Sequence, residues 1–143
     1  MNRFLYEKSV SYQGYLIIPF LLAKVSGEFI YSYVLLSAQG YEDELHKAKN
    51  PTQVCSNTLT GIVEIAQQYL NENSIHLGED NYFDKRYTYQ NTLIIIHYEG
   101  KRCFYDHYPS DELRNIAAPT LFLNADSCID WIKTRLDRRQ VKF

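Results

Sequence analysis

The sequence lacks several features by which common protein classes are recognised. It has only three cysteines, which are scattered along the chain at Cys55, Cys103 and Cys128. None belongs to a C-x-x-C pair, so the pattern is typical of packing residues in a reducing compartment rather than of a disulfide framework or a zinc site. There is also no P-loop, G-x-G-x-x-G, H-E-x-x-H, G-x-S-x-G or calcium-loop pattern. The usual enzyme classes are therefore not indicated, and we expect neither a metal nor an organic cofactor.

Long apolar runs and a leader-like segment are missing as well. The longest apolar stretch, residues 15–23, contains Pro19 and is far shorter than the roughly 20 residues that cross a bilayer as a helix. Residues 1–10 alternate polar and apolar side chains and carry Glu7 and Lys8, unlike the continuous apolar core of a secretory signal. We therefore expect a cytoplasmic protein that does not enter a membrane.

Charge of either sign is not in large excess. The formal net charge is -2, so we expect no global basic field toward nucleic acid. The exception is local, because residues 133–143 are rich in Lys and Arg. This segment fits either a solvated helix end whose cations complement the helix dipole, or a contact with phosphate or an acidic partner.

Aromatic residues, in contrast, are abundant. The chain has 13 Tyr, 7 Phe and a single tryptophan, Trp131. Because Tyr and Phe favour strands, this composition predicts a protein rich in β-structure. A length of 143 residues suits one compact domain with its own core.

The clearest signal in the sequence is an internal repeat. The matching segments are residues 6–18 with 83–95, 43–45 with 111–113, 51–52 with 119–120, and 61–70 with 127–136. The first match shares a Lys, a Tyr-Gln pair and a Leu-Ile-Ile run without a gap, and the second is the tripeptide Asp-Glu-Leu. Because the blocks keep the same order, we expect one domain, 1–143, made of repeat one, 1–74, and repeat two, 79–143, with a hinge at 71–81.

Each repeat is expected to contain four strands before a helix. The expected turns are Gln13-Gly14, Ser26-Gly27, Gln90-Asn91 and Glu99-Gly100. They delimit opening strands that start at Tyr6 and Phe83, followed by strands at 16–25, 28–37, 92–98 and 101–107. A fourth strand is expected after each Pro-Thr pair, at Thr52–Cys55 and Thr120–Leu123.

A helix is expected to close each repeat. Asn57 or Thr58 is expected to cap the first helix, and Asn124 or Asp126 the second. Apolar positions fall on one face of each helix: Leu59, Ile62, Val63, Ala66 and Leu70 in the first, and Ile129, Ile132 and Leu136 in the second. Each helix therefore has an apolar stripe to bury against its sheet.

The fold class that follows is α+β. We expect an internally duplicated ββββα unit whose two antiparallel sheets and two helices form one pseudo-twofold domain. The strand at 16–25 is apolar on both faces, with Ile18, Phe20 and Leu22 on one and Ile17 and Leu21 on the other. Such a strand must be covered twice. The second cover is either the other repeat or another subunit, so a homodimer is also an expected arrangement.

The most enzyme-like cluster lies in the second hairpin, at His97, Glu99, Cys103, Asp106 and His107. With a two-residue turn at Glu99-Gly100, His97 pairs with Arg102, and His97 and Cys103 project to opposite faces. This register forms no Cys-His pair, so it favours an ordinary hairpin in a protein that is not an enzyme. A small enzyme centred here would need a pocket that brings His97 or His107 near a carboxylate.

A second candidate site lies on the opening strands, where aromatic and basic residues alternate. The residues expected to contact nucleic acid are Lys8, Tyr12, Lys85, Arg86, Tyr87 and Tyr89. The tyrosines would stack on exposed bases, and the cations would contact phosphate. The other interpretation is that the tyrosine rings cover the rim of the core while each lysine extends past them to water.

The expected order of elements resembles that of the single-stranded-DNA-binding transcriptional regulators of the Whirly type. The resemblance spans nearly the whole chain and implies paired units whose curved sheets hold melted DNA. We therefore expect a small, non-enzymatic binding or regulatory protein whose ligand is single-stranded nucleic acid. The alternative is an adaptor whose sheet forms a protein interface, or a homodimer of another function.

Overall fold

The computed structural model describes residues 3–74, 82–99, 102–117, 122 and 124–141. Its elements, in chain order, are η1 (Tyr6–Lys8), β1 (Val10–Tyr12), β2 (Tyr15–Val25), β3 (Glu28–Ser37), η2 (Gly40–Glu42), α1 (Leu59–Asn73), β4 (Arg86–Tyr89), β5 (Thr92–Glu99), β6 (Arg102–Tyr108) and α2 (Ala125–Val141). The predicted hinge at 71–81 begins inside α1, and its residues 75–81 lie outside the described part of the chain.

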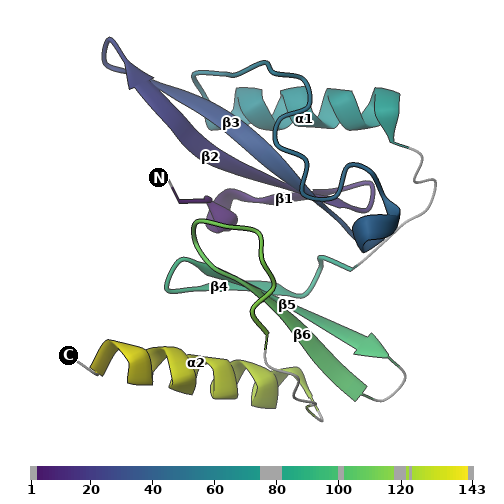
Figure 1. The fold of residues 1–143 in the computed structure, drawn as a ribbon, viewed down its shortest axis with the longest axis vertical. Coiled ribbons are helices and arrows are strands. Elements are labelled where there is room, and N and C mark those ends of the chain that lie inside the picture. Colours follow the sequence, from purple (N-terminus) through teal and green to yellow (C-terminus); the bar gives the residue numbers. More distant parts are fainter. Residues whose placement is uncertain (1–2, 75–81, 100–101, 118–121, 123, 142–143) are drawn as a thin grey trace.

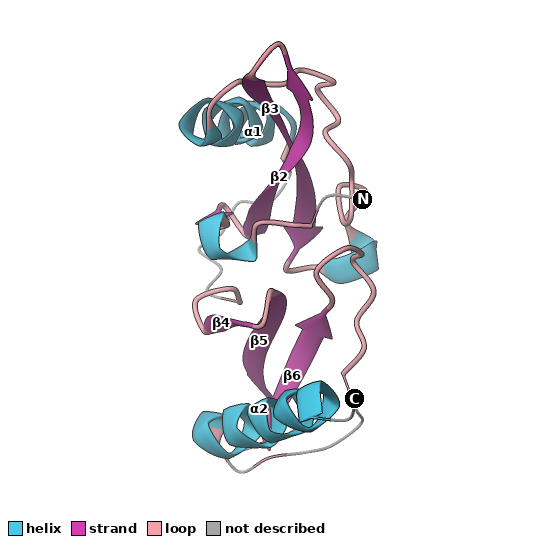
Figure 2. Ribbon diagram, turned by 90° about the vertical axis from the view of Figure 1, so that its left-hand side faces the viewer, coloured by secondary structure: helices cyan, strands magenta, loops and turns pink. Residues whose placement is uncertain are grey.

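The elements form four layers. Two antiparallel sheets, with strand orders β1-β2-β3 and β4-β5-β6, lie face to face, and one helix covers the outer side of each sheet (Figure 1). Figure 2 shows the same layers from the side. The predicted α+β class with two antiparallel sheets and two helices is therefore confirmed. Within the described residues each sheet has three strands, where four were expected, and most of the fourth strand expected in the second repeat lies outside that part of the chain.

The two sheets share a central core. Its buried side chains come from both sheets and from the N-terminal segment: Phe4, Tyr6, Leu16, Ile18, Val34, Leu36, Phe83, Leu93, Ile95 and Tyr108. The other face of β2 packs through Tyr15 and Ile17 against α1. Over residues 15–19 both apolar faces of β2 are thus covered within one chain, so this part of the pattern does not argue for a second subunit.

Each helix packs through residues spaced four apart. The buried positions are Ile62, Ala66 and Leu70 in α1, and Cys128, Ile132 and Leu136 in α2. Four-residue spacing keeps these side chains on one face, which confirms the predicted stripe of the first helix. In the second helix Cys128 takes the buried position that was assigned to Ile129, and Ile129 packs at the margin of the cluster.

The helix caps follow the prediction. The N-cap Thr58 accepts a hydrogen bond at Oγ1 from the Gly61 amide over 3.0 Å. Asn124 accepts one at Oδ1 from the Ser127 amide over 2.8 Å. Each bond gives a partner to one of the amides that a helix start leaves without an intrahelical acceptor.

Three predicted turns are confirmed. Gln13 and Gly14 have φ of 51° and 80°, Ser26 and Gly27 have 52° and 83°, and Gln90 and Asn91 have 52° and 63°. Two successive positive φ values are the signature of the type I′ turn, whose twist matches that of paired strands. The flanking residues pair directly, as Tyr12 does with Tyr15.

The register of the second long hairpin differs from the prediction. Glu99 pairs with Arg102 and His97 pairs with Phe104, so a turn at Glu99-Gly100 and a pairing of His97 with Arg102 are wrong. The strand continues through Glu99 because Tyr98 still pairs with Cys103. A shift of two residues keeps every side chain on its face, and His97 and Cys103 therefore still project to opposite faces.

The opening strands are shorter than predicted. Tyr6 and Lys8 lie in the 3-10 turn η1, and Phe83 and Lys85 precede β4 instead of belonging to it. The reason is tertiary, because Tyr6 and Phe83 both turn into the central core. Tyr6 also donates its hydroxyl to the carbonyl oxygen of Pro109 over 2.5 Å. The expected face of Tyr6, Lys8 and Tyr12 on one strand does not exist.

The fourth strand expected in the first repeat is reduced to isolated pairings. Thr52–Cys55 forms no strand; instead, the chain pairs with β3 on either side of it, at Lys49 with Val34 and at Ser56 with Tyr31. Of Thr120–Leu123 only Phe122 is described, and it pairs with Cys103, whereas residues 120, 121 and 123 lie outside the described part. None of the described helices is both long and apolar enough to cross a membrane.

Candidate functional site

Two of the tyrosines predicted to stack on bases face the helices. Tyr12 donates its hydroxyl to Asn71 Oδ1 on α1 over 2.6 Å, and Tyr89 donates to Asp137 Oδ1 on α2 over 2.6 Å. The hydrogen bond to Asp137 raises the pKa of Tyr89. Both rings also pack against the adjoining helix–sheet core. Tyr12 and Tyr89 thus belong to the rim of the core, as the alternative interpretation proposed.

Arg86 joins the two sheets. Its guanidinium donates to Ser9 Oγ and Ser9 O, each over 3.1 Å, and to Phe83 O over 2.8 Å. Burial lowers its pKa below the ordinary arginine value. We call this arrangement the Arg86 clamp, because it ties the segment before β1 to β4.

The remaining predicted residues are Lys8, Lys85 and Tyr87, and all three are exposed. Tyr87 is 40% exposed, and Lys85 Nζ lies 4.7 Å from the ring centre of Tyr98, which is 45% exposed. Tyr87 pairs with Ile94 and Tyr98 follows on the same face of β5, so Tyr87, Lys85 and Tyr98 share the outer face of the second sheet. We call these three side chains the tyrosine platform. Tyr98 was not predicted as part of this site, because it lies on the neighbouring strand β5 and not on the opening strand.

A larger concave site lies under the end of the β2–β3 hairpin. The two long hairpins extend toward opposite sides of the molecule (Figure 1), and β2 and β3 have 11 and 10 residues where β5 and β6 have 8 and 7. The end of the longer hairpin therefore projects beyond the second sheet. Beneath it lies a cavity of about 640 Å³, which we call the hairpin groove.

The floor of the hairpin groove is apolar. Phe20 and Leu22 reach it from β2, and Phe4 from the N-terminal segment. The rings of Phe4 and Phe20 meet edge to face at 5.7 Å, and the Phe4 amide donates to Ser110 O over 2.7 Å. Leu22 is 49% exposed although it continues the apolar row of the central core. Such an uncovered apolar floor is typical of a binding site.

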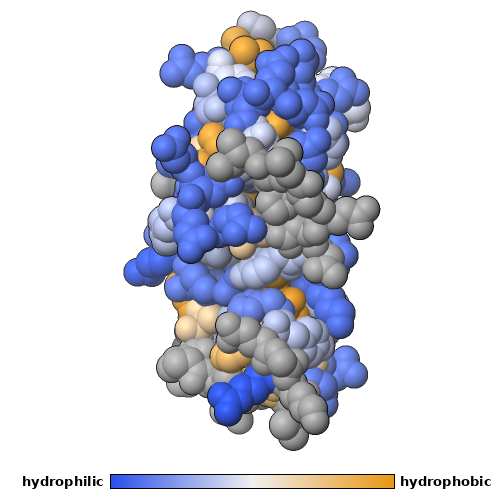
Figure 3. Space-filling view, turned by 90° about the vertical axis from the view of Figure 1, so that its right-hand side faces the viewer, coloured by the Kyte–Doolittle hydropathy of each residue, from blue (hydrophilic) through white to orange (hydrophobic). Residues whose placement is uncertain are grey.

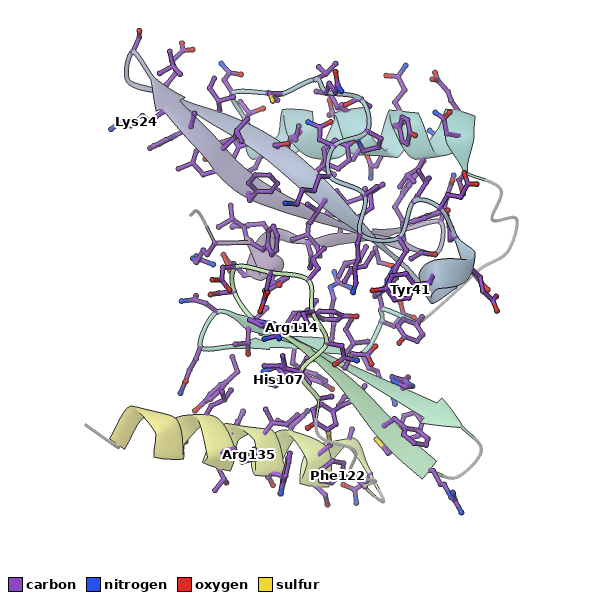
Figure 4. The ribbon with its side chains drawn as sticks, in the orientation of Figure 1. Lys24, Tyr41, His107, Arg114, Phe122 and Arg135 are labelled. Atoms are coloured by element: carbon purple, nitrogen blue, oxygen red, sulfur yellow. The ribbon has the colours of Figure 1, made fainter. Side chains whose placement is uncertain are left out.

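The walls of the groove are charged. Lys47 and Lys49 line one side, and the residues of the other side are Asp111, Glu112, Leu113 and Arg114. Arg114 forms an ion pair with Glu112 over 3.1 Å. Outside this pair the charged lining residues are Asp111, Lys47 and Lys49, and the Lys47 ammonium also donates a hydrogen bond to the Tyr41 hydroxyl over 2.6 Å. Figure 4 shows Arg114 near the middle of the molecule, far from Lys24 at the hairpin end.

Polar side chains, the buried Asp43 and the exposed Asn115, hold both walls in place. Asp43 accepts hydrogen bonds from the Tyr15 hydroxyl, from Ser37 Oγ over 3.1 Å and from the Leu45 amide over 2.9 Å. Burial raises the pKa of Asp43, but these hydrogen bonds outweigh burial and keep it below its ordinary value. Asp43 therefore fixes the loop that leads into Lys47 and Lys49.

Asn115 has the same role for the opposite wall. Its Oδ1 accepts from the amides of His107 and Ala117, each over 3.0 Å, and its Nδ2 donates to Asp106 Oδ1 over 2.9 Å. These bonds fix residues 111–114 against β6. The Asp-Glu-Leu segments of both repeats thus lie in loops, and only the second lines the groove.

The structure brings His97 near a carboxylate. His97 Nε2 lies 3.4 Å from Asp106 Oδ1, and its ring stacks between Tyr82 and Phe104 at 5.3 and 5.8 Å. Tyr82 also donates to Asp106 Oδ2 over 2.5 Å. Burial raises the pKa of Asp106, but the hydrogen bonds from His97, Tyr82 and Asn115 keep it below its ordinary value. These contacts bring residues 82, 97 and 115 together around the Asp106 carboxylate.

The opposite side of the molecule is mainly polar. On the face seen in Figure 3 the described residues are mostly hydrophilic, and the hydrophobic areas are small and separate. No described group of three or more His, Cys, Asp and Glu residues is arranged to hold a metal ion. The hairpin groove, at about 640 Å³, is larger than three other cavities of about 330, 270 and 240 Å³ among the described residues.

No family model, curated protein or solved structure matches this chain. The residues of the groove were not singled out from the sequence, because they come from four separate segments. The one available signal was Leu22, which continues an apolar face of β2 to the end of the hairpin.

Proposed function

We propose that the protein is a non-enzymatic binding protein that holds an amphipathic carboxylate in the hairpin groove. The observation that carries the proposal is the combination of an apolar floor at Phe4, Phe20 and Leu22 with Lys47 and Lys49 on the wall. An acyl chain would cover the floor, and its carboxylate would meet the two ammonium groups.

The size of the groove supports a small ligand. Its volume of about 640 Å³ lies inside the range of roughly 300–1,000 Å³ found for small-molecule sites. The charges support an anion, because Glu112 is paired with Arg114 and Asp111 alone opposes Lys47 and Lys49. A neutral chain of the same length can contact the apolar floor but cannot pair with the lysines. We therefore expect it to bind more weakly.

Calorimetric titration of octanoate and octanol separates the two contributions. We expect octanoate to bind, and the double variant Lys47→Gln/Lys49→Gln to weaken it by about 2- to 30-fold, from roughly 0.2–1 kcal/mol for each exposed charge pair. Octanol binding should not change in that variant. Leu22→Ser should weaken both ligands, because it removes part of the shared floor.

Lys24→Gln is the matched control for the charge change. Lys24 lies at the hairpin end, where its Nζ is 5.5 Å from the Phe29 ring, and it does not line the groove. The proposal is wrong if octanoate fails to bind, or if Lys24→Gln weakens it as much as the double variant does.

A specific observation supports a second function, the binding of single-stranded nucleic acid by the tyrosine platform. Tyr87 and Tyr98 expose two rings on one sheet face, with the ammonium of Lys85 beside them. Stacking on each ring contributes roughly 1–3 kcal/mol per base in proteins of this kind, and phosphate contacts make binding weaken with salt.

Labelled oligonucleotides titrated at low and at physiological salt test this function. We expect binding at low salt that weakens as salt rises, and a loss of binding in Tyr87→Ala/Tyr98→Ala. Tyr41→Ala is the control, because Tyr41 is 80% exposed on η2, away from the platform. Absence of binding at the lower salt concentration ends this second proposal.

We also infer that the two sheet–helix units are copies produced by internal duplication. The contacts support this inference, since Tyr12 and Gln13 both donate to Asn71, and Tyr89 and Gln90 both donate to Asp137. In the repeat alignment these partners occupy equivalent positions. A duplicated origin leaves two frameworks that can diverge separately, and the hairpin groove takes lining residues from both of them.

A further inference from the structure

A second cavity, of about 270 Å³, lies between β6 and α2. Tyr105 and His107 line it from the strand, and Trp131 and Arg135 from the helix. In Figure 4 His107 lies in the layer between the second sheet and α2, and Arg135 lies on α2. This cavity shares no lining residue with the hairpin groove. We call it the Trp131 pocket.

One wall of the pocket is aromatic and well braced. Tyr105 and Trp131 meet at 6.2 Å with their planes 66° apart, and Phe122 meets Trp131 at 5.5 Å and Tyr105 at 5.9 Å. Tilted and edge-to-face contacts of this kind are the favourable geometries for aromatic pairs. The opposing wall is aliphatic, formed by Ile116, Ile132 and Leu136. The space between the walls suits a flat, apolar group.

The polar side of the pocket is basic. The guanidinium carbon of Arg135 lies 4.6 Å from the ring centre of Trp131. A guanidinium held on an aromatic face keeps its N–H donors in one plane, and it can hold a carboxylate through two parallel hydrogen bonds. His107 adds a buried imidazole, and its backbone amide donates a hydrogen bond to Asn115 Oδ1 that fixes its place on β6.

The first sheet–helix unit has Tyr33 at the place that matches Tyr105, but it lacks the imidazole, the indole and the guanidinium at the other matching places. Leu35 pairs with Ile17 as His107 pairs with Ile94, and Ile65 and Tyr69 follow the buried Ile62 at the spacing at which Trp131 and Arg135 follow the buried Cys128. That unit therefore has Leu, Ile and Tyr where the second has His, Trp and Arg. The basic and aromatic set is a departure of the second unit from a shared apolar packing.

We propose that the Trp131 pocket binds a small planar aromatic carboxylate. The ring lies between the face formed by Tyr105 and Trp131 and the aliphatic wall, and the carboxylate meets Arg135. A volume of about 270 Å³ lies below the usual range for drug-sized ligands, which restricts the ligand to one or two rings.

Trp131 makes the test direct, because it is the only tryptophan of the chain. Benzoate is titrated while the emission of Trp131 is followed, and saturation-transfer NMR detects benzoate itself. We expect a saturable change in emission, with benzyl alcohol and cyclohexanecarboxylate at least about tenfold weaker. The proposal is overturned if benzoate gives no saturable change in the millimolar range, or if either analogue binds equally well.

Two variants locate the interaction. Arg135→Gln should remove the preference for benzoate over benzyl alcohol while the circular dichroism spectrum stays unchanged. Lys133→Gln is the matched control, because Lys133 lies on the same helix with its Nζ 5.4 Å from the Tyr89 ring, outside the pocket. Equal weakening by both variants overturns the assignment to Arg135. The groove variant Lys47→Gln/Lys49→Gln should leave benzoate binding unchanged, so this proposal and the proposed function fail separately.

Discussion

The shared central core predicts that the two sheets unfold together. The informative perturbation is a pair of neighbouring residues on β2, both fully buried: Leu16 in the central core and Ile17 in the core against α1. Trp131 lies in the outer core of the other unit. If the central core couples the units, a substitution at either residue of the first unit lowers the midpoint of thermal unfolding that Trp131 emission reports.

The magnitude follows from burial. Replacing a fully buried Leu or Ile by Ala costs about 2–5 kcal/mol, because apolar contact is lost and a cavity remains. For a chain of this size each kcal/mol shifts the melting temperature by about 4 °C. We therefore expect Leu16→Ala and Ile17→Ala to lower the midpoint by roughly 8–20 °C.

The assay is thermal unfolding followed in the same sample by far-ultraviolet circular dichroism and by Trp131 emission. Dichroism reports both units, whereas the emission reports the second unit alone. We expect coincident midpoints in the parent protein and in both variants. The reasoning is refuted if Ile17→Ala leaves the Trp131 midpoint unchanged while the dichroism curve splits into two transitions, since the units would then be independent.

Three further predictions concern pH and the helix starts. Burial and the hydrogen bond to Asp43 raise the pKa of Tyr15 to about 12, whereas in the unfolded chain it is about 10. The free energy of unfolding should therefore fall between pH about 10 and about 12. The fall should be less steep in Tyr15→Phe. Asp106 has a lowered pKa, so its contribution is present above pH about 4 and lost as pH falls further; the acid limb of a stability–pH profile should flatten in Asp106→Asn. Thr58→Ala and Asn124→Ala should each lower the free energy of unfolding in urea by about 1 kcal/mol, whereas Thr60→Ala, inside α1, should have a smaller effect.

Local chemistry explains which parts of the fold were predictable. The turns at residues 13–14, 26–27 and 90–91 and the caps Thr58 and Asn124 depend on a few adjacent residues. The three turns were predicted correctly, and each cap is one of the two residues expected for its helix. The predicted length of the opening strands was wrong because Tyr6 and Phe83 pack in a core to which both units contribute. Alternation in sequence indicates a strand, but it does not show where tertiary packing ends that strand.

The sites were harder to predict than the elements. The hairpin groove combines the N-terminal segment, β2, residues 47–49 and residues 111–114, and no spacing in the chain connects these four segments. Of the aromatic and basic line predicted on the opening strand of the second repeat, Lys85 and Tyr87 remain accessible. Tyr98 completes it from β5, and its place beside Lys85 depends on the strand register.

The Arg86 clamp affects whether copies of this protein can associate through the edges of their sheets. A sheet edge with unpaired backbone groups is a template on which another chain can add a strand. Here β1 and β4 have only 3 and 4 residues, and the guanidinium of Arg86 occupies backbone and hydroxyl oxygens beside both of them. A concentrated solution of the protein should therefore not aggregate. Replacing Arg86 should first increase the tendency to form fibres.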